Sequence, residues 1–116
     1  MIPGYASMHR SGELAHRARR ALELMSPCHV CPRRCETDRS ADEVGVCGVG
    51  RLAVVASAGP HFGEEAPLVG RRGSGTVFFS GCSLSCVFCQ NADISHQPGA
   101  GTLVDAPELA LLFERM

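Results

Sequence analysis

Hydrophobic residues repeat at helical spacing in the first part of the chain, residues 1–26. The stripe consists of Leu14, Ala18, Ala21, Leu22 and Met25. Arg17 and Arg20 fall toward the other side, which predicts one amphipathic helix in an N-terminal arm. Ser11 stands where its hydroxyl can cap this helix, with Glu13 in the first turn. We expect the helix to pack on the rest of the protein, with partner docking as the alternative.

The pattern changes to that of strands further along the chain. Alternation over Leu52–Ala56 predicts a short strand that breaks at Gly59-Pro60. Residues 76–79, Thr-Val-Phe-Phe, are apolar on both faces, which is typical of a parallel strand covered on each side. Residues 90–104 follow as a loop. A helix is then predicted from near Ala106, with Asp105 as its N-cap.

Three cysteines follow the strand at 76–79 directly, in a CxxxCxxC run made of Cys82, Cys86 and Cys89. Three thiolates so close together can bind three corners of a four-iron, four-sulfur cube, whereas closed metal sites normally take four protein ligands. One iron would then stay open to chemistry. A structural zinc site completed by His96 is the alternative, but the first gap of three residues, the aromatic Phe88 and the preceding strand favour the cluster.

The other four cysteines form a second group, Cys28, Cys31, Cys35 and Cys47. Four thiols suffice for a closed tetrahedral shell. The group could hold a structural zinc ion or a second iron–sulfur cluster, or stay metal-free and reduced, and the spacing does not decide between zinc and iron. His29 is a competing donor, although it lies next to Cys28.

The run from Gly73 to Asn91 resembles the radical SAM superfamily, whose CxxxCxxC signature carries an aromatic residue before the last cysteine, as Phe88 does here. It is similar in particular to the pyruvate formate-lyase activating enzyme-like branch. That similarity extends upstream through Ser11–Leu14, Cys31–Cys35 and Gly45–Gly48, and so covers most of the chain.

The resemblance implies a mechanism. Cys82, Cys86 and Cys89 would each bind one iron of a [4Fe-4S] cluster, whose fourth iron chelates S-adenosyl-L-methionine (SAM). Phe88 would lie against the adenine. One-electron reduction, from a donor such as flavodoxin or ferredoxin, would cleave SAM to methionine and a 5'-deoxyadenosyl radical. In the activating enzymes this radical takes hydrogen from a glycine of a partner enzyme.

The implied fold is α/β, the start of a radical SAM partial (β/α) barrel. Residues 1–72 would be a helical arm and a cysteine-rich extension with the second metal site, and residues 73–116 the first strand, cluster loop and first helix. A full eight-unit barrel takes about 250 residues. We therefore expect the 116-residue chain to be an N-terminal portion of a larger enzyme, truncated after the first βα unit and incomplete for catalysis on its own.

The overall composition narrows the function further. It is 45% hydrophobic and 20% charged with a net charge of −1, and the sequence shows neither a membrane span nor an export signal, so we expect a cytoplasmic protein. Seven cysteines, an odd number, indicate metal binding in a reducing compartment. No basic excess or aromatic platform predicts nucleic-acid binding. The contrasting hypothesis is a non-catalytic zinc-binding module.

Overall fold

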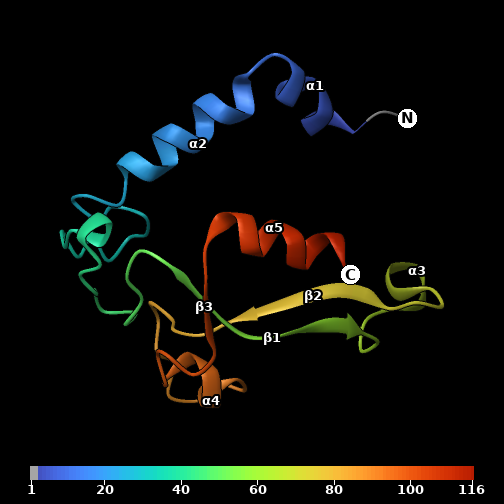
Figure 1. The fold of residues 1–116 in the computed structure, drawn as a ribbon. Coiled ribbons are helices and arrows are strands. Elements are labelled where there is room, and N and C mark those ends of the chain that lie inside the picture. The colour runs from blue at the N-terminus through green and yellow to red at the C-terminus, as the bar shows by residue number, and fades with distance from the viewer. Residues whose placement is uncertain (1–2) are drawn as a thin grey trace.

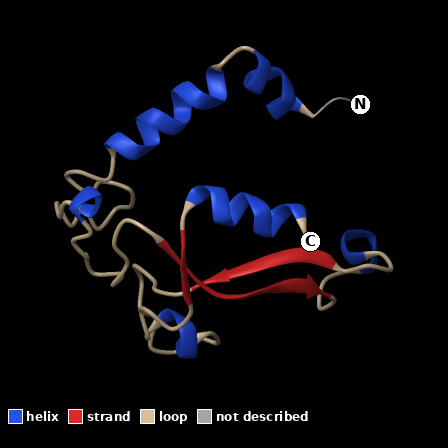
Figure 2. Cartoon of the chain, in the orientation of Figure 1, coloured by secondary structure: helices blue, strands red, loops and turns tan. Residues whose placement is uncertain are grey.

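A computed structural model describes residues 3–116, and Figure 1 traces the chain from the N-terminal arm to the last helix. The helices are α1 (Gly4–Arg10), α2 (Glu13–Glu23), the 3-10 turn η1 (Arg39–Ala41), α3 (Ala66–Val69), α4 (Ala92–Ser95) and α5 (Ala106–Glu114). The strands are β1 (Ala53–His61), β2 (Ser74–Phe79) and β3 (Thr102–Val104). Figure 2 shows these strands in the middle of the molecule, with helices and long loops around them.

The strands form one antiparallel sheet in the order β2-β1-β3. The pairing of β1 with β2 runs from Val55 opposite Phe79 to His61 opposite Ser74, with an irregularity between Val55 and Ser57. β3 is shorter and pairs only with residues 53–55 of β1. The central strand therefore comes from the segment expected as the extension, and both neighbours come from the segment expected as the barrel start.

Both predicted strands are present, but the end of the first and the exposure of the second differ from the prediction. β1 does not break at Gly59-Pro60 but continues to His61. β3 pairs only with residues 53–55, so at Pro60 the strand β1 has a neighbour, β2, on one side only. The proline is tolerated because its missing N–H removes no hydrogen bond on the open side. β2 pairs antiparallel with β1, and Phe79 at its end is 44% exposed, so the strand is not covered on both faces among residues 3–116. Its parallel partner stays a prediction.

The arm contains two helices instead of one, because Gly12 takes a left-handed conformation (φ 78°) between them. The predicted cap was wrong: the Ser11 hydroxyl donates to the Met8 carbonyl of α1 at 3.0 Å, and Gly12 stands at the N-cap of α2. α2 contacts α1 but buries none of its own residues, and Leu22 is 64% exposed. The expected packing of the apolar stripe is therefore not found within residues 3–116.

The C-terminal helix is confirmed with its cap. The Asp105 carboxylate accepts from the Glu108 N–H and the Glu108 carboxylate accepts from the Asp105 N–H, both at 2.8 Å, which is a capping box. The preceding segment was predicted as loop alone, yet it includes α4 and β3. No helix among the described residues is long and apolar enough to cross a membrane.

The buried core is small and lies at the start of β1. Its buried side chains include Cys28, Val54 and Val55, together with polar Arg39 and Ser80. These residues come from the cysteine-rich segment, from β1 and from the end of β2. The core therefore joins the segments that carry the two cysteine groups.

Candidate metal centre

The loop with the CxxxCxxC run is anchored at its base by Ser80, which is only 3% exposed. Its N–H donates to the Val54 carbonyl at 2.8 Å, which extends the β1–β2 ladder. Its hydroxyl lies 2.9 Å from the Gln97 carbonyl and 3.2 Å from the Ile94 carbonyl. The Gly81 N–H also donates to the Ile94 carbonyl, at 2.9 Å. The two ends of the cysteine loop are therefore held together just beyond the sheet.

Two of the three loop sulfurs already have hydrogen-bond partners. Cys82 Sγ accepts from the Leu84 N–H at 3.4 Å, and Cys89 Sγ lies 3.1 Å from the Ser95 hydroxyl of α4. Backbone hydrogen bonds from Leu84 and then Ser85 lower the pKa of Cys82. Since the thiolate is the metal-binding form of cysteine, these donors favour ligation. Cys82, Cys86 and Cys89 are all partly exposed, so a cofactor could reach them.

Phe88 is 85% exposed, and the neighbouring Val87 and Leu84 are 96% and 69% exposed. The aromatic ring is thus not part of the core of residues 3–116. Three exposed apolar side chains therefore stand between Cys82 and Cys89 in the loop. The position of Phe88 is compatible with its predicted contact to adenine, which stays a prediction.

Three members of the second cysteine group, Cys28, Cys31 and Cys35, lie in one turn that closes between Cys28 and Thr37. The Cys28 N–H donates to the Thr37 carbonyl at 2.9 Å and the Glu36 N–H donates back to the Cys28 carbonyl at 3.3 Å, so Cys35 returns beside Cys28. Gly45 is close to Cys35: a methyl group in its place would stand 2.8 Å from Cys35 Sγ. Cys28 is 1% exposed.

Arg39 connects two sulfurs of this group. Its Nε–H donates to Cys28 Sγ and its Nη2–H to Cys47 Sγ, each at 2.8 Å, and its Nη1–H donates to the Val49 carbonyl. The bonds to Cys47 and Cys28 raise the pKa of Arg39. A hydrogen bond from Val30, opposed by burial and assisted by Arg39, lowers the pKa of Cys28. Arg39 itself is only 8% exposed.

The two cysteine groups meet at one cavity of about 320 Å³. Cys31 and Cys47 line it from the extension and Cys82 from the loop. Two further contacts join the segments: Arg33 Nε donates to the Ser83 carbonyl at 2.7 Å, and Gly81 lies against the Cys47 carbonyl. Because Gly81 has φ 85° and lacks a Cβ, the loop can approach that carbonyl closely.

Within residues 3–116, no three histidine, cysteine or carboxylate side chains stand close enough to hold one metal ion. His29 and His96 therefore complete no such group there. The ligands of a four-iron cube, in contrast to those of a single ion, each bind a different iron and need not converge on one point. Three accessible cysteines, of which Cys82 and Cys89 already have hydrogen-bond partners, fit a cluster in ligand type and number.

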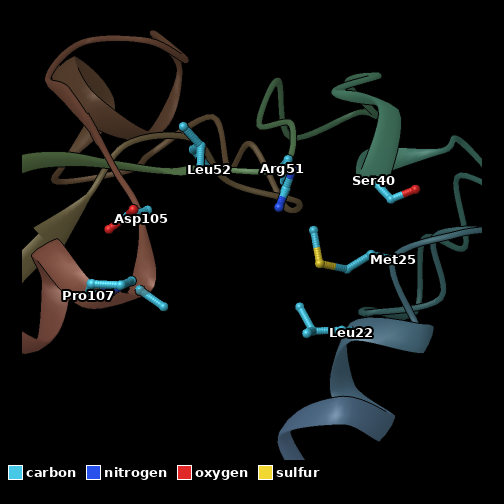
Figure 3. A pocket seen from close by; sticks show the side chains of 8 residues that line it. Leu22, Met25, Ser40, Arg51, Leu52, Asp105 and Pro107 are labelled. Atoms are coloured by element: carbon cyan, nitrogen blue, oxygen red, sulfur yellow. The ribbon is translucent and has the colours of Figure 1, made fainter.

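A second cavity, of about 600 Å³, lies between the end of the arm and the start of α5. Figure 3 shows Leu22 and Met25, at the end of α2 and just beyond it, on one side, and Asp105 and Pro107, at the start of α5, on the other. It contains neither a cysteine nor a histidine.

Comparison with known proteins finds one relative of note. Over 75 residues the chain is 40% identical to a Methanocaldococcus jannaschii protein whose name is uncharacterized protein MJ0674. The alignment covers 65% of this chain and 21% of the relative, so the chain spans about a fifth of that protein's length. No protein-family model matches the chain, and no solved structure does.

Several residues of the site escaped the sequence analysis. The partners of Arg39 lie 8 and 11 positions away, and Gln97, a partner of Ser80, lies 17 positions away. Ser95 contacts Cys89 across six positions. Local sequence patterns do not reveal such contacts. The one available signal for Arg39 was its position between the third and fourth cysteines of the second group.

Proposed function

We propose that this chain is the cluster-binding part of a radical SAM protein, in which Cys82, Cys86 and Cys89 hold a [4Fe-4S] cluster. The observation that carries the proposal is a CxxxCxxC loop at the C-terminal end of β2 whose three cysteines are all accessible. Three ligands leave one iron free, which a purely structural site does not need. The likeness of the wider run to the activating enzyme-like branch supports the same conclusion.

A cluster held there would supply the electron that cleaves SAM into methionine and a 5'-deoxyadenosyl radical. The residues of this chain would bind and orient. Phe88 offers adenine an exposed apolar face. The Leu84 N–H and the Ser95 hydroxyl can donate to cysteine sulfurs, and such hydrogen bonds tune the reduction potential of a cluster.

Partners and location belong to the proposal as well. A flavodoxin- or ferredoxin-like donor would supply the electron, and a glycine of a partner protein is the proposed substrate. The second cysteine group would hold zinc or another iron–sulfur cluster. None of the seven cysteines forms a disulfide among the described residues, and a reducing compartment such as the cytoplasm is the proposed location.

The test is anaerobic reconstitution with iron and sulfide of the wild type and of Cys82→Ala, Cys86→Ala and Cys89→Ala. The wild type should turn brown, bind about four iron atoms at the CxxxCxxC loop and bind SAM. Each loop variant should lose that iron and the SAM binding, while the control Cys28→Ala keeps both. The cluster is then reduced with a chemical reductant, and cleavage of SAM is measured as the formation of methionine and 5'-deoxyadenosine.

Unchanged loop iron and SAM binding in any of the three single variants would refute the assignment. A colourless protein whose loop cysteines bind zinc would support the alternative, a non-catalytic zinc-binding module.

A further inference from the structure

Arg39 is a buried cation without a carboxylate partner. The ion pairs within residues 3–116 are Arg17 with Glu13 and His61 with Glu64, so none involves Arg39. A guanidinium keeps its charge when buried, and burying it without an opposite charge is strongly unfavourable. Its side-chain acceptors are the sulfurs of Cys28 and Cys47. Two cysteine sulfurs therefore stand beside this buried guanidinium, where a carboxylate would be the usual partner.

The geometry of these bonds also restricts what the thiolates can bind. Nε–H and the adjacent Nη–H form one edge of a planar, rigid group, so the acceptors of the two bonds lie side by side. In a tetrahedral zinc site with Zn–S bonds of about 2.3 Å, neighbouring sulfurs are about 3.8 Å apart. The ligands of a cube bind separate irons and stand farther apart. Adjacent sulfurs on one guanidinium edge thus suit a single ion.

We propose that Cys28, Cys31, Cys35 and Cys47 bind one zinc ion, and that Arg39 is the residue that positions two of these thiolates and balances their charge. Cys28 and Cys47 are the preformed half of the site. The turn places the backbone of Cys35 beside that of Cys28, and Cys31 lines the same cavity as Arg39 and Cys47. Zinc binding would bring these two side chains to the other pair. Four thiolates around zinc leave two negative charges, one of which Arg39 offsets.

A buried oxygen in the same turn lacks a partner. Thr37 Oγ1 is buried and has no hydrogen-bond partner among the described residues, although the Thr37 carbonyl accepts from the Cys28 N–H. Buried hydroxyls are nearly always paired, and a metal-bound thiolate would be a suitable acceptor. The inference concerns the second cysteine group only and stands or falls independently of cluster chemistry at the loop.

The experiment uses the full chain with Cys82, Cys86 and Cys89 all changed to Ser, so that only the second group can bind metal. Zinc per chain is measured after purification, and the zinc dissociation constant by competition with a chromophoric chelator. Arg39→Gln and Arg39→Lys are added to this background. Arg34→Gln is the matched control, an exposed arginine in the same turn.

The background protein and the control should bind about one zinc per chain, held by the four thiolates of the second group. Arg39→Gln should weaken zinc binding by about 10- to 100-fold, as loss of an outer-shell partner does, and Arg39→Lys should recover part of it. With Co²⁺ in place of zinc, the sulfur-to-cobalt charge-transfer band of Arg39→Gln should move to lower energy, because its thiolates have lost a cationic donor. A change in packing alone would not produce that shift.

Several results would overturn the proposal. Absence of zinc from the background protein would exclude the site, and recovery of iron with sulfide in its place would exclude a single ion. Equal zinc affinity in Arg39→Gln and Arg34→Gln would remove Arg39 from it. If Arg39→Gln does not fold, Arg39→Lys decides: an affinity and a cobalt band identical to those of the background protein would refute the positioning role.

Discussion

The contact between the two cysteine-bearing segments can be tested at Gly81. Replacing Gly81 with Ala would place the new methyl group 2.6 Å from the Cys47 carbonyl oxygen and 2.6 Å from a methyl group of Val49. Gly99→Ala is a matched control, because Gly99 has a similar positive φ of 93° but nothing within 4 Å of the new atom. The difference between the variants therefore isolates the contact with the extension.

The expected magnitudes follow from these two observations. Both variants force an L-residue into the left-handed region, which costs about 1–2 kcal/mol. Gly81→Ala adds an overpacking cost of about 1–3 kcal/mol, since a backbone carbonyl cannot rotate out of the way as a flexible side chain can. For a urea m-value of about 2 kcal/mol/M, the midpoint of Gly81→Ala should lie about 0.5–1.5 M below that of Gly99→Ala.

The assay is equilibrium urea unfolding of the two variants and the wild type, followed by circular dichroism under reducing conditions. Replacing glycine by alanine also lowers the conformational entropy of the unfolded chain, which raises the stability of both variants by the same amount, so this effect cancels in the comparison. Equal midpoints would show that Gly81 does not pack on the Cys47 carbonyl, and the arrangement of the two cysteine groups around one cavity would have to be abandoned.

Phe88→Ala should leave loop iron unchanged and weaken SAM binding by about 1–3 kcal/mol, the range for stacking of a base on an aromatic ring. The control is Phe62→Ala, an exposed aromatic outside the loop, and an unchanged dissociation constant in Phe88→Ala would contradict the adenine contact. Ser80→Ala should lower the free energy of unfolding by about 0.5–1.5 kcal/mol for a lost buried hydrogen bond. Exposed Ser57→Ala should change it little, and equal urea midpoints would argue against the anchor. Hydrogen bonds from Ser40 and then Ser26 lower the pKa of Asp38. Its carboxylate should therefore stabilise the fold at pH values above the ordinary aspartate pKa of about 3.9, and this stabilisation should be lost as the pH falls below it. Asp38→Asn should abolish that part of the pH dependence when the free energy of unfolding is measured against pH.

Local signals predicted the elements whose stabilising contacts are local. Asp105 and Glu108 cap α5 three positions apart, so their pattern is visible in the sequence. Ser11 and Gly12 both suit a helix end, and the sequence does not indicate that glycine would separate two helices there. The continuation of β1 through Pro60 depends on β2, which lies 13 or more residues further along.

The same distinction applies to the site. The spacing of Cys82, Cys86 and Cys89 predicts a cluster because ligand spacing is a local property. The contact of Arg39 with Cys28 and Cys47 depends on a turn and on burial that follow from the packing of distant segments. A lone arginine in a polar stretch otherwise indicates a solvated side chain.

The position of β1 between β2 and β3 has a consequence for any attempt to divide the protein. β2 and β3 have no pairing with each other and meet only through β1. A fragment beginning at residue 73 would keep the CxxxCxxC loop but lose its central strand, and two strand edges would be left open to pairing with other chains. Transplanting this loop into another protein would therefore require the cysteine-rich segment and β1 to be carried with it.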